Sequence, residues 1–253
     1  MIKKIEPSLL DQKFIFEKDC QKNFIKDEVD YTKIIVQKPW GYEYPIYQNS
    51  DVSVWILYIK KGALTSMHCH PNKKTSLMVL SGEAIVRSLN EKMYVQAGNV
   101  IDIEKKAFHS TEAITEPGAI VMETETPTDK HDLLRLEDKY GRVGMQYEGK
   151  EHSLPRSMEM HYSFHDETNY HEKEKIFGQC RLTIKRFKTN QELLNYFWVM
   201  EADIVCVLKG AFIKPQNICV LGPGDTSAYS EIKKHDDLEI AGVEAEILFI
   251  KKL

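Results

Sequence analysis

The chain has 253 residues, and its 34 Lys and Arg against 38 Asp and Glu give a formal net charge of −4. The basic residues are scattered, which argues against a nucleic-acid-binding surface. No apolar run approaches the roughly 18 residues of a membrane-spanning helix, so no membrane partner is expected. The first residues lack the apolar core of a signal peptide, and the five cysteines show no close pairing. We therefore expect a cytoplasmic protein.

Residues 1–38 are mixed and charged, with weak strand character at 14–16 and 33–36. We interpret this segment as an arm laid over a neighbouring sheet. From residue 38 onward, strand-like runs follow one another at short intervals, separated by Gly, Pro or Asn. Many short strands at this spacing predict an antiparallel sandwich or barrel. The runs are expected at 42–47, 52–59, 75–80, 83–88, 99–103 and 119–125.

The pattern changes after these strands. From Thr128 to Gly141 the apolar residues lie at 133, 134, 136 and 140, and the segment ends in glycine. This pattern predicts a short helix. The polar, turn-rich residues 143–175 are expected to connect two halves of the chain.

The second half repeats features of the first. Each half has a strand-like run that ends in glycine, and two further glycines follow at similar intervals. These glycines are Gly82, Gly98 and Gly118 in the first half, and Gly210, Gly224 and Gly242 in the second. An internal repeat of this size predicts two similar modules, which we place at residues 1–150 and 151–253.

Three histidines mark the stretch from Gly62 to His109. His68 and His70 are separated by one residue, so on a strand their side chains leave the same face. His109 follows a turn and a second strand-like run, which a barrel could bring back beside the first. Two same-face imidazoles and a third from a neighbouring strand suit a metal site with open coordination positions. We predict that the three histidines bind a divalent ion, which could be Zn, Fe, Mn, Ni or Co.

Two glutamates are the candidates for proton transfer. Glu123 and Glu125 alternate along a predicted strand, so they share a face. If that face lines a barrel, one carboxylate could complete the metal shell and the other could act as a base. The alternative is a solvated strand edge.

Three basic residues are candidates for binding an anionic substrate. The planar fork of Arg135 suits a phosphate or sugar hydroxyls. Lys73 and Lys74 follow the first two histidines and could attract an anion, although a solvated turn explains them equally well. His161, His165 and His171 raise the alternative of a second metal site, but no firm helical period aligns them.

The histidine motifs carry a family resemblance. Gly62 to Gly82 reads G-x5-H-x-H-x4-T-x6-G, and Gly98 to His109 reads G-x10-H. These motifs resemble those of the cupin superfamily, whose members are double-stranded β-helix (jelly-roll) barrels. The resemblance implies barrels of this kind. Together with the repeat and the helical pattern described above, it leads us to expect an all-β fold with two such barrels and a short helix after the first, the second barrel lacking the metal motif. Thr75 stands where cupins usually carry an acidic ligand, so three of the usual four ligands remain.

A narrower resemblance covers residues 38–142. The sequence KPWGYE from Lys38 and the pattern D-x-x-R-x-x-D-x-Y-G-R from Asp132 resemble type II phosphomannose isomerases. This implies a metal-dependent isomerase or epimerase that acts on a sugar phosphate or nucleotide-linked sugar for surface polysaccharide synthesis. Glu125 or Glu123 would move the proton, and Arg135 would hold the anionic end of the substrate.

Two alternatives to a sugar isomerase remain open from the sequence. Three histidines without a carboxylate also resemble the iron site of thiol dioxygenase cupins. A sugar-binding or scaffold bicupin without catalysis is the other alternative, because the loss of the acidic ligand at Thr75 could mark lost activity. The expected partner in the leading hypothesis is a small sugar or sugar phosphate, and the protein could be a monomer or a homodimer.

Overall fold

The structure is a computed structural model that describes residues 1–18, 29–148, 150–167, 169–197, 199–235 and 237–253. It consists mostly of β-strands, as predicted, with few and short helices. The described part of the chain contains no helix that is long and apolar enough to cross a membrane.

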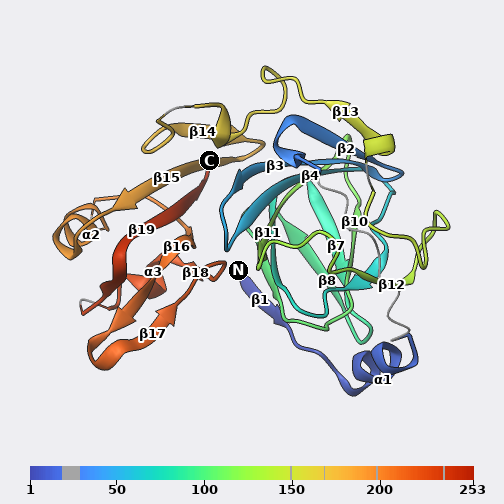
Figure 1. Ribbon diagram of the computed structural model, residues 1–253, viewed down its shortest axis with the longest axis horizontal. Helices are drawn as coiled ribbons and strands as arrows, with labels where there is room; N and C mark the ends of the chain where they lie inside the picture. Colours follow the sequence, from blue (N-terminus) through green and yellow to red (C-terminus); the bar gives the residue numbers. More distant parts are fainter. Residues whose placement is uncertain (19–28, 149, 168, 198, 236) are drawn as a thin grey trace.

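The first half of the chain builds three sheets around a common interior (Figure 1). The largest has the order β1-β9-β6-β11-β4-β3-β2-β13, and the others have the orders β10-β7-β8 and β12-β5. The large sheet contains β1 (Ile2–Ile5), β2 (Ile34–Lys38), β3 (Gly41–Gln48), β4 (Ser53–Lys60), β6 (Lys74–Ser81), β9 (Val100–Ile103), β11 (Gly118–Thr126) and β13 (Ser153–Pro155). The smaller sheets contain β5 (Met67–Cys69), β7 (Glu83–Arg87), β8 (Lys92–Gln96), β10 (Ser110–Ala113) and β12 (Leu134–Glu137).

A two-residue alternation places side chains on the two faces of the large sheet. On β11, Val121 packs into the interior of the first half, whereas Met122 packs on the opposite face. Trp55 and Leu57 on β4 point inward in the same way. Because Glu123 and Glu125 continue the inward register of Val121, both glutamates are directed into the interior.

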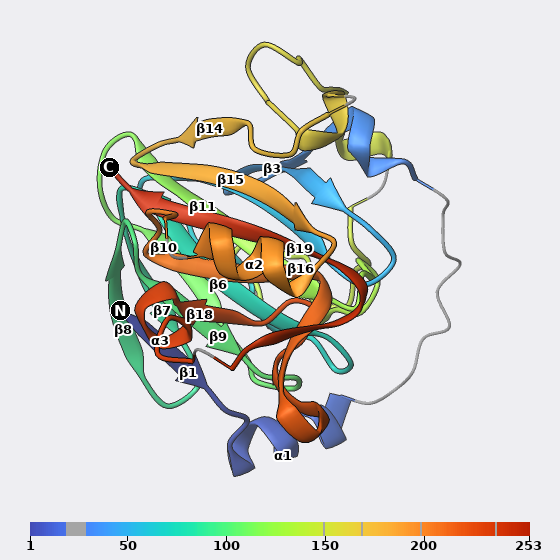
Figure 2. The ribbon, with the colours of Figure 1, turned by 90° about the vertical axis from the view of Figure 1, so that its left-hand side faces the viewer.

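The second half forms one sheet of the order β14-β15-β19-β16-β17, with β18 also paired to β16. Helix α2 crosses its outer side (Figure 2), and α3 packs into the same apolar cluster. The prediction that this half is a second cupin barrel stays a prediction. The elements are β14 (Glu174–Phe177), β15 (Cys180–Phe187), α2 (Asn190–Phe197), β16 (Ile204–Lys214), β17 (Ile218–Leu221), β18 (Thr226–Ala228), α3 (Tyr229–Ile232) and β19 (Glu239–Lys252).

The two halves share one apolar core. The outer face of the large sheet packs against the inner face of the second sheet, and the buried residues of both form a single cluster. Its members include Ile46, Val54, Met78 and Met122 from the first half and Leu182, Ile204, Leu208 and Ile250 from the second. Polar contacts flank this core, such as the hydrogen bond of 2.6 Å that the Thr226 hydroxyl donates to Asp102. The halves are therefore expected to unfold together.

Shortening Ile250 to valine tests this shared core. Ile250 is fully buried between the two halves, so Ile250→Val should lower the free energy of unfolding by about 1 kcal/mol. Urea unfolding followed by circular dichroism should show one transition, shifted to lower urea with an unchanged slope. Val243→Ala is the control because Val243 is 90% exposed. Two separate transitions in the wild type would contradict the shared core.

Two sequence predictions about helices are wrong. Residues 14–16, expected as a weak strand, lie within helix α1 (Leu9–Lys18), and the expected helix from Thr128 to Gly141 contains strand β12. Its register places Leu134 opposite Cys69 and Arg135 opposite His68, so pairing with β5 overrides the helical pattern. Short 3-10 turns occur at η1 (Tyr31–Lys33), η2 (Lys150–His152), η3 (Phe164–Asp166) and η4 (Pro215–Asn217).

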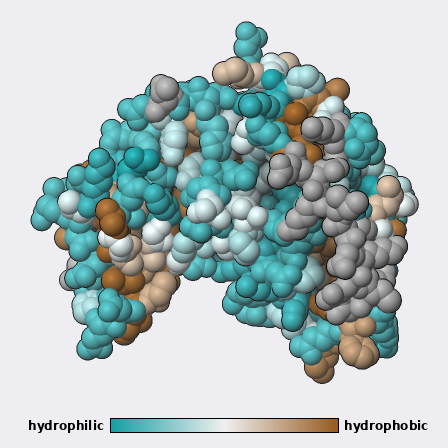
Figure 3. Space-filling model, viewed as in Figure 1, coloured by the Kyte–Doolittle hydropathy of each residue, from teal (hydrophilic) through white to brown (hydrophobic). Residues whose placement is uncertain are grey.

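The surface drawn in Figure 3 is largely hydrophilic, with hydrophobic side chains gathered over β17 and at α1.

Strand β13 lies beyond residue 150 but pairs with β2 in the large sheet. The first sheet therefore continues past the boundary that we placed between the two modules.

Candidate active site

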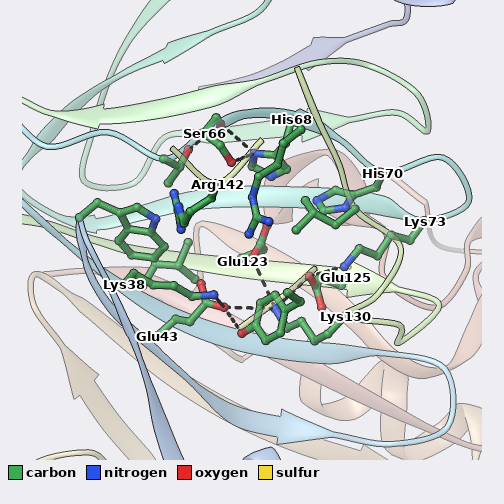
Figure 4. A pocket seen from close by; sticks show the side chains of 16 residues that line it. Lys38, Glu43, Ser66, His68, His70, Lys73, Glu123, Glu125, Lys130 and Arg142 are labelled. Carbon is green, nitrogen blue, oxygen red and sulfur yellow. Dashed lines mark hydrogen bonds and ion pairs between the residues drawn. The ribbon is translucent and has the colours of Figure 1, made fainter. Parts of the chain in front are cut away.

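The three histidines of the sequence motifs meet inside the first barrel. His68 lies on β5, His70 follows that strand directly, and His109 precedes β10. The backbones of His68 and His109 exchange two hydrogen bonds of 3.0 and 2.8 Å. The ligating nitrogen atoms of the three rings lie within 4.8 Å of one another. Figure 4 shows His68 and His70 at one wall of the pocket.

The hydrogen bonds of the three rings set their tautomers. Each Nδ1 lies against a backbone carbonyl, which can only accept, so each Nδ1 carries the proton and each Nε2 keeps its lone pair. The partners are Ser66 O at 2.8 Å for His68, Asp132 O at 2.6 Å for His70 and Ala107 O at 3.1 Å for His109. The Nε2 atoms of His70 and His109 are buried without a partner among the described residues.

The electrostatics of the rings suit a metal. Burial lowers the pKa of His68 and His70 well below the usual value and lowers that of His109 to about 4. The imidazoles are therefore neutral near pH 7, which is the form that binds metals. Buried lone pairs without donors are unfavourable unless something fills the space between them. The three residues thus fit a divalent metal ion.

Thr75 occupies the position where the sequence motif would carry an acidic ligand. It is 1% exposed, and its hydroxyl has no partner in the described ranges. A neutral hydroxyl is a weak metal donor, so it cannot replace a carboxylate. Glu123 and Glu125 instead bring carboxylate oxygens within 4.8 Å of a ring nitrogen of His70.

Glu123 and Glu125 are both buried, at 6% and 2% exposure, so the alternative of a solvated strand edge is wrong. Burial and the neighbouring charge of Glu125 raise the pKa of Glu123 to about 7. Burial opposes the charge of Glu125 too, but Lys130 and Lys73 outweigh it and lower its pKa. Their Nζ atoms lie 3.1 and 2.7 Å from its carboxylate. Carboxylates with opposite pKa shifts are typical of an acid–base pair.

The pocket beside the histidines is lined by five basic residues, each with a carboxylate partner. Figure 4 shows most of these side chains converging on one space. The ion pairs are Lys73–Glu125, Lys130–Glu125, Lys38–Glu148, Arg135–Glu148 and Arg142–Glu148. Lys130 also lies 3.6 Å from the ring centre of Trp55, and Lys38 lies 3.7 Å from that of Tyr147. Aromatic rings and acids together offset the cost of burying these ammonium groups.

Only two of the three predicted anion-binding residues lie at the pocket. Lys73 and Arg135 line the pocket. Lys74 does not, because it lies on the opposite face of β6, where its Nζ is 2.6 Å from Asp225 of the second half. The prediction that Lys74 meets the substrate is therefore wrong. Arg135 donates to the carbonyls of Met145 and Gln146, which ties it to the segment that contributes Tyr147 to the pocket.

The three later histidines have separate partners. His161 packs edge-on against Tyr42 and Tyr44, and His171 lies 3.1 Å from Glu246. His165 stacks on Tyr47. Among the described residues they form no metal cluster.

Several pocket residues escaped the sequence analysis, namely Lys38, Glu43, Lys130, Arg142 and Tyr147. Lys38 and Glu43 begin and end the KPWGYE motif, so the motif itself was an available signal. Lys130 reaches the barrel interior from the loop after β11, and no periodicity could reveal that direction.

The cupin family model matches residues 33–136. The chain carries a cupin domain. This domain contains all three histidines, both glutamates and Lys130. No curated protein matches the chain.

Solved structures resemble part of this chain at low identity. KdgF from a Halomonas species is 22% identical over 42% of this chain and 94% of its own, with a TM-score of 0.36. The capsular polysaccharide assembling protein CapF from Staphylococcus aureus is 20% identical over 41% of this chain and 34% of its own, with a TM-score of 0.37. A sugar phosphate isomerase from Silicibacter pomeroyi is 14% identical over 41% of this chain and 76% of its own, with a TM-score of 0.35. No conclusion about function follows from likenesses this distant.

Proposed function

We propose that the cupin domain is a metal-dependent isomerase or epimerase of a sugar phosphate or nucleotide-linked sugar. The observation that carries this proposal is the convergence of three neutral, Nδ1-anchored imidazoles with a glutamate pair of opposite pKa shifts. His68, His70 and His109 would hold the ion. The resemblance of residues 38–142 to phosphomannose isomerases supports the choice of substrate class.

Isomerisation requires a proton to move between adjacent carbons of the sugar. A divalent ion bound to the histidines would polarise the sugar carbonyl or an adjacent hydroxyl as a Lewis acid. Glu123, whose raised pKa lies near neutrality, is suited to take the proton from one carbon and return it to the next. Glu125 stays ionised between Lys73 and Lys130 and contributes negative charge beside it. The assignment thus separates a proton-transfer residue from a charged neighbour.

The anionic end of the substrate would meet Arg135 and Lys73. Every pocket cation already has a carboxylate partner, so a phosphate must share these cations with Glu125 and Glu148. Arg135 keeps one donor free for this, because its buried Nε has no acceptor in the described part of the chain. A bound metal would add positive charge beside these groups.

The first test is the metal content of protein purified without added metal or chelator. We expect near-stoichiometric metal in the wild type and little in a His68→Ala/His109→Ala variant, because two of three ligands are lost. Zinc, manganese or cobalt would be followed by sugar phosphate isomerisation assays. Iron with oxygen uptake would favour the dioxygenase alternative. Absence of metal even after a metal soak would overturn both enzyme functions and leave a sugar-binding domain.

The cytoplasmic location and the choice between monomer and homodimer stay predictions. The shared core shows that the two halves of one chain already cover each other's apolar faces.

A further inference from the structure

The N-terminal arm runs beside the strand that leads to His109. Strand β1 pairs in parallel with β9, with Ile2 opposite Val100 and Ile5 opposite Ile103. The amide of Glu104 then donates to the carbonyl of Ile5 at 3.0 Å. The arm therefore holds the backbone up to the start of the loop that carries His109.

The arm contacts that loop again through Asp11, which is 3% exposed. Its Oδ1 accepts a hydrogen bond of 2.7 Å from the backbone amide of Phe108, the residue before His109. Its Oδ2 accepts from the backbone amide of Ser8 at 2.8 Å. Ser8 Oγ in turn lies 3.3 Å from the Asp11 amide, which completes a capping box at the start of α1. The Asp11 carboxylate thus joins the cap of α1 to the loop that carries His109.

The backbone at Phe108 determines where the His109 ring points. Phe108 is fully buried, and the His109 amide donates to His68 O at 2.8 Å. The Nδ1 of His109 is anchored on the carbonyl of Ala107, one residue before Phe108. Lys106 adopts a φ of 70°, a conformation that costs a non-glycine residue energy. The loop therefore depends on contacts with other segments. A hydrogen bond that a buried carboxylate accepts is among the strongest hydrogen bonds in proteins.

We infer that Asp11 is a positioning residue for His109, so the N-terminal arm is a working part of the metal centre. The inference rests on the proposed metal site. Asp11 is not among the residues that would hold the ion. It fixes the backbone from which the third ligand projects, in the way that outer partners orient metal ligands elsewhere.

The test compares Asp11→Ala with Ser8→Ala. Both variants weaken the cap of α1, but only Asp11→Ala removes the bond to Phe108. Cobalt affinity, measured by competition with a chromophoric chelator, should fall about 10- to 100-fold in Asp11→Ala. It should stay near the wild-type value in Ser8→Ala. The visible spectrum of bound cobalt should change only in Asp11→Ala, because its ligand geometry changes.

A second measurement is independent of the metal. Hydrogen exchange in the metal-free protein should be faster at the Phe108 amide in Asp11→Ala than in Ser8→Ala. Asp11→Asn, which keeps the size and one acceptor, should give intermediate affinity and serves if the alanine variant does not fold. Equal cobalt affinities in the Asp11 and Ser8 variants would overturn the role of Asp11 but not the proposed metal site. A wild type that binds no cobalt would overturn the metal site as well.

Discussion

Replacing Glu123 by glutamine should lower kcat for sugar isomerisation by about 100- to 10,000-fold, the usual contribution of a general acid or base. Glutamine keeps the shape of the side chain but cannot exchange a proton. Because the proposed metal ligands are the three histidines and not Glu123, metal content is expected to stay the same. Steady-state kinetics with metal analysis on the same preparation would measure both quantities.

The matched control is Glu112→Gln, since Glu112 is a strand glutamate that pairs with Arg87 on a partly exposed face. Its kcat should equal that of the wild type. Glu125→Gln is the discriminating variant, because Glu125 is held ionised by Lys73 and Lys130 and is not assigned the proton transfer. Full activity in Glu123→Gln, with activity lost in Glu125→Gln, would reverse the assignment of the two roles.

Several strands of the first half could be predicted, because they are strand-like runs separated by Gly, Pro or Asn. Strands β8 and β10 were not among the expected runs. β3, β4, β6 and β11 were all expected within a few residues of their observed bounds. β12 was missed because its apolar residues also fit a helical period, and only its pairing with β5 decides between the two. The capping box at Ser8 outweighs the local strand propensity of residues 14–16.

The residues of the candidate site likewise include some that the sequence could predict and some that it could not. His68 and His70 could be paired from spacing alone, since residues two apart share a face of a strand. Lys74 was assigned to the pocket, although a strand directs it opposite to its neighbour Lys73. Lys130 could not be found, because a loop carries it back over Trp55. Long-range contacts of this kind leave no periodic trace in a sequence.

The position of Lys130 explains how two glutamates on one strand acquire different proton affinities. Its Nζ lies 3.1 Å from Glu125 but 4.0 Å from Glu123. The positive charge therefore stabilises the ionised form of Glu125 more than that of Glu123, and Lys73 adds to the difference. Burial and the negative charge of Glu125 then raise the pKa of Glu123.

Lys130→Met should therefore change both stability and the pH dependence of activity. Methionine keeps most of the stem that packs on Trp55 but removes the charge, which leaves buried acids undercompensated. We expect the free energy of unfolding to fall by about 3 kcal/mol. The charge of Lys130 lowers the pKa of Glu123, so its removal raises that pKa further. The measurements are urea unfolding at pH 7 and kcat/KM against pH.

The direction of the pH effect follows from the role of Glu123. A base must be ionised, so kcat/KM of the wild type should fall as pH drops through the pKa of Glu123. That pKa is about 7 without metal, and a bound dication would lower it, so the wild-type midpoint is expected at or below pH 7. In Lys130→Met the midpoint should move upward by about one pH unit. Lys139→Met, at an exposed position, should leave both the midpoint and the stability unchanged. A midpoint that stays in place in Lys130→Met would mean that Glu123 is not the group whose ionisation controls the reaction.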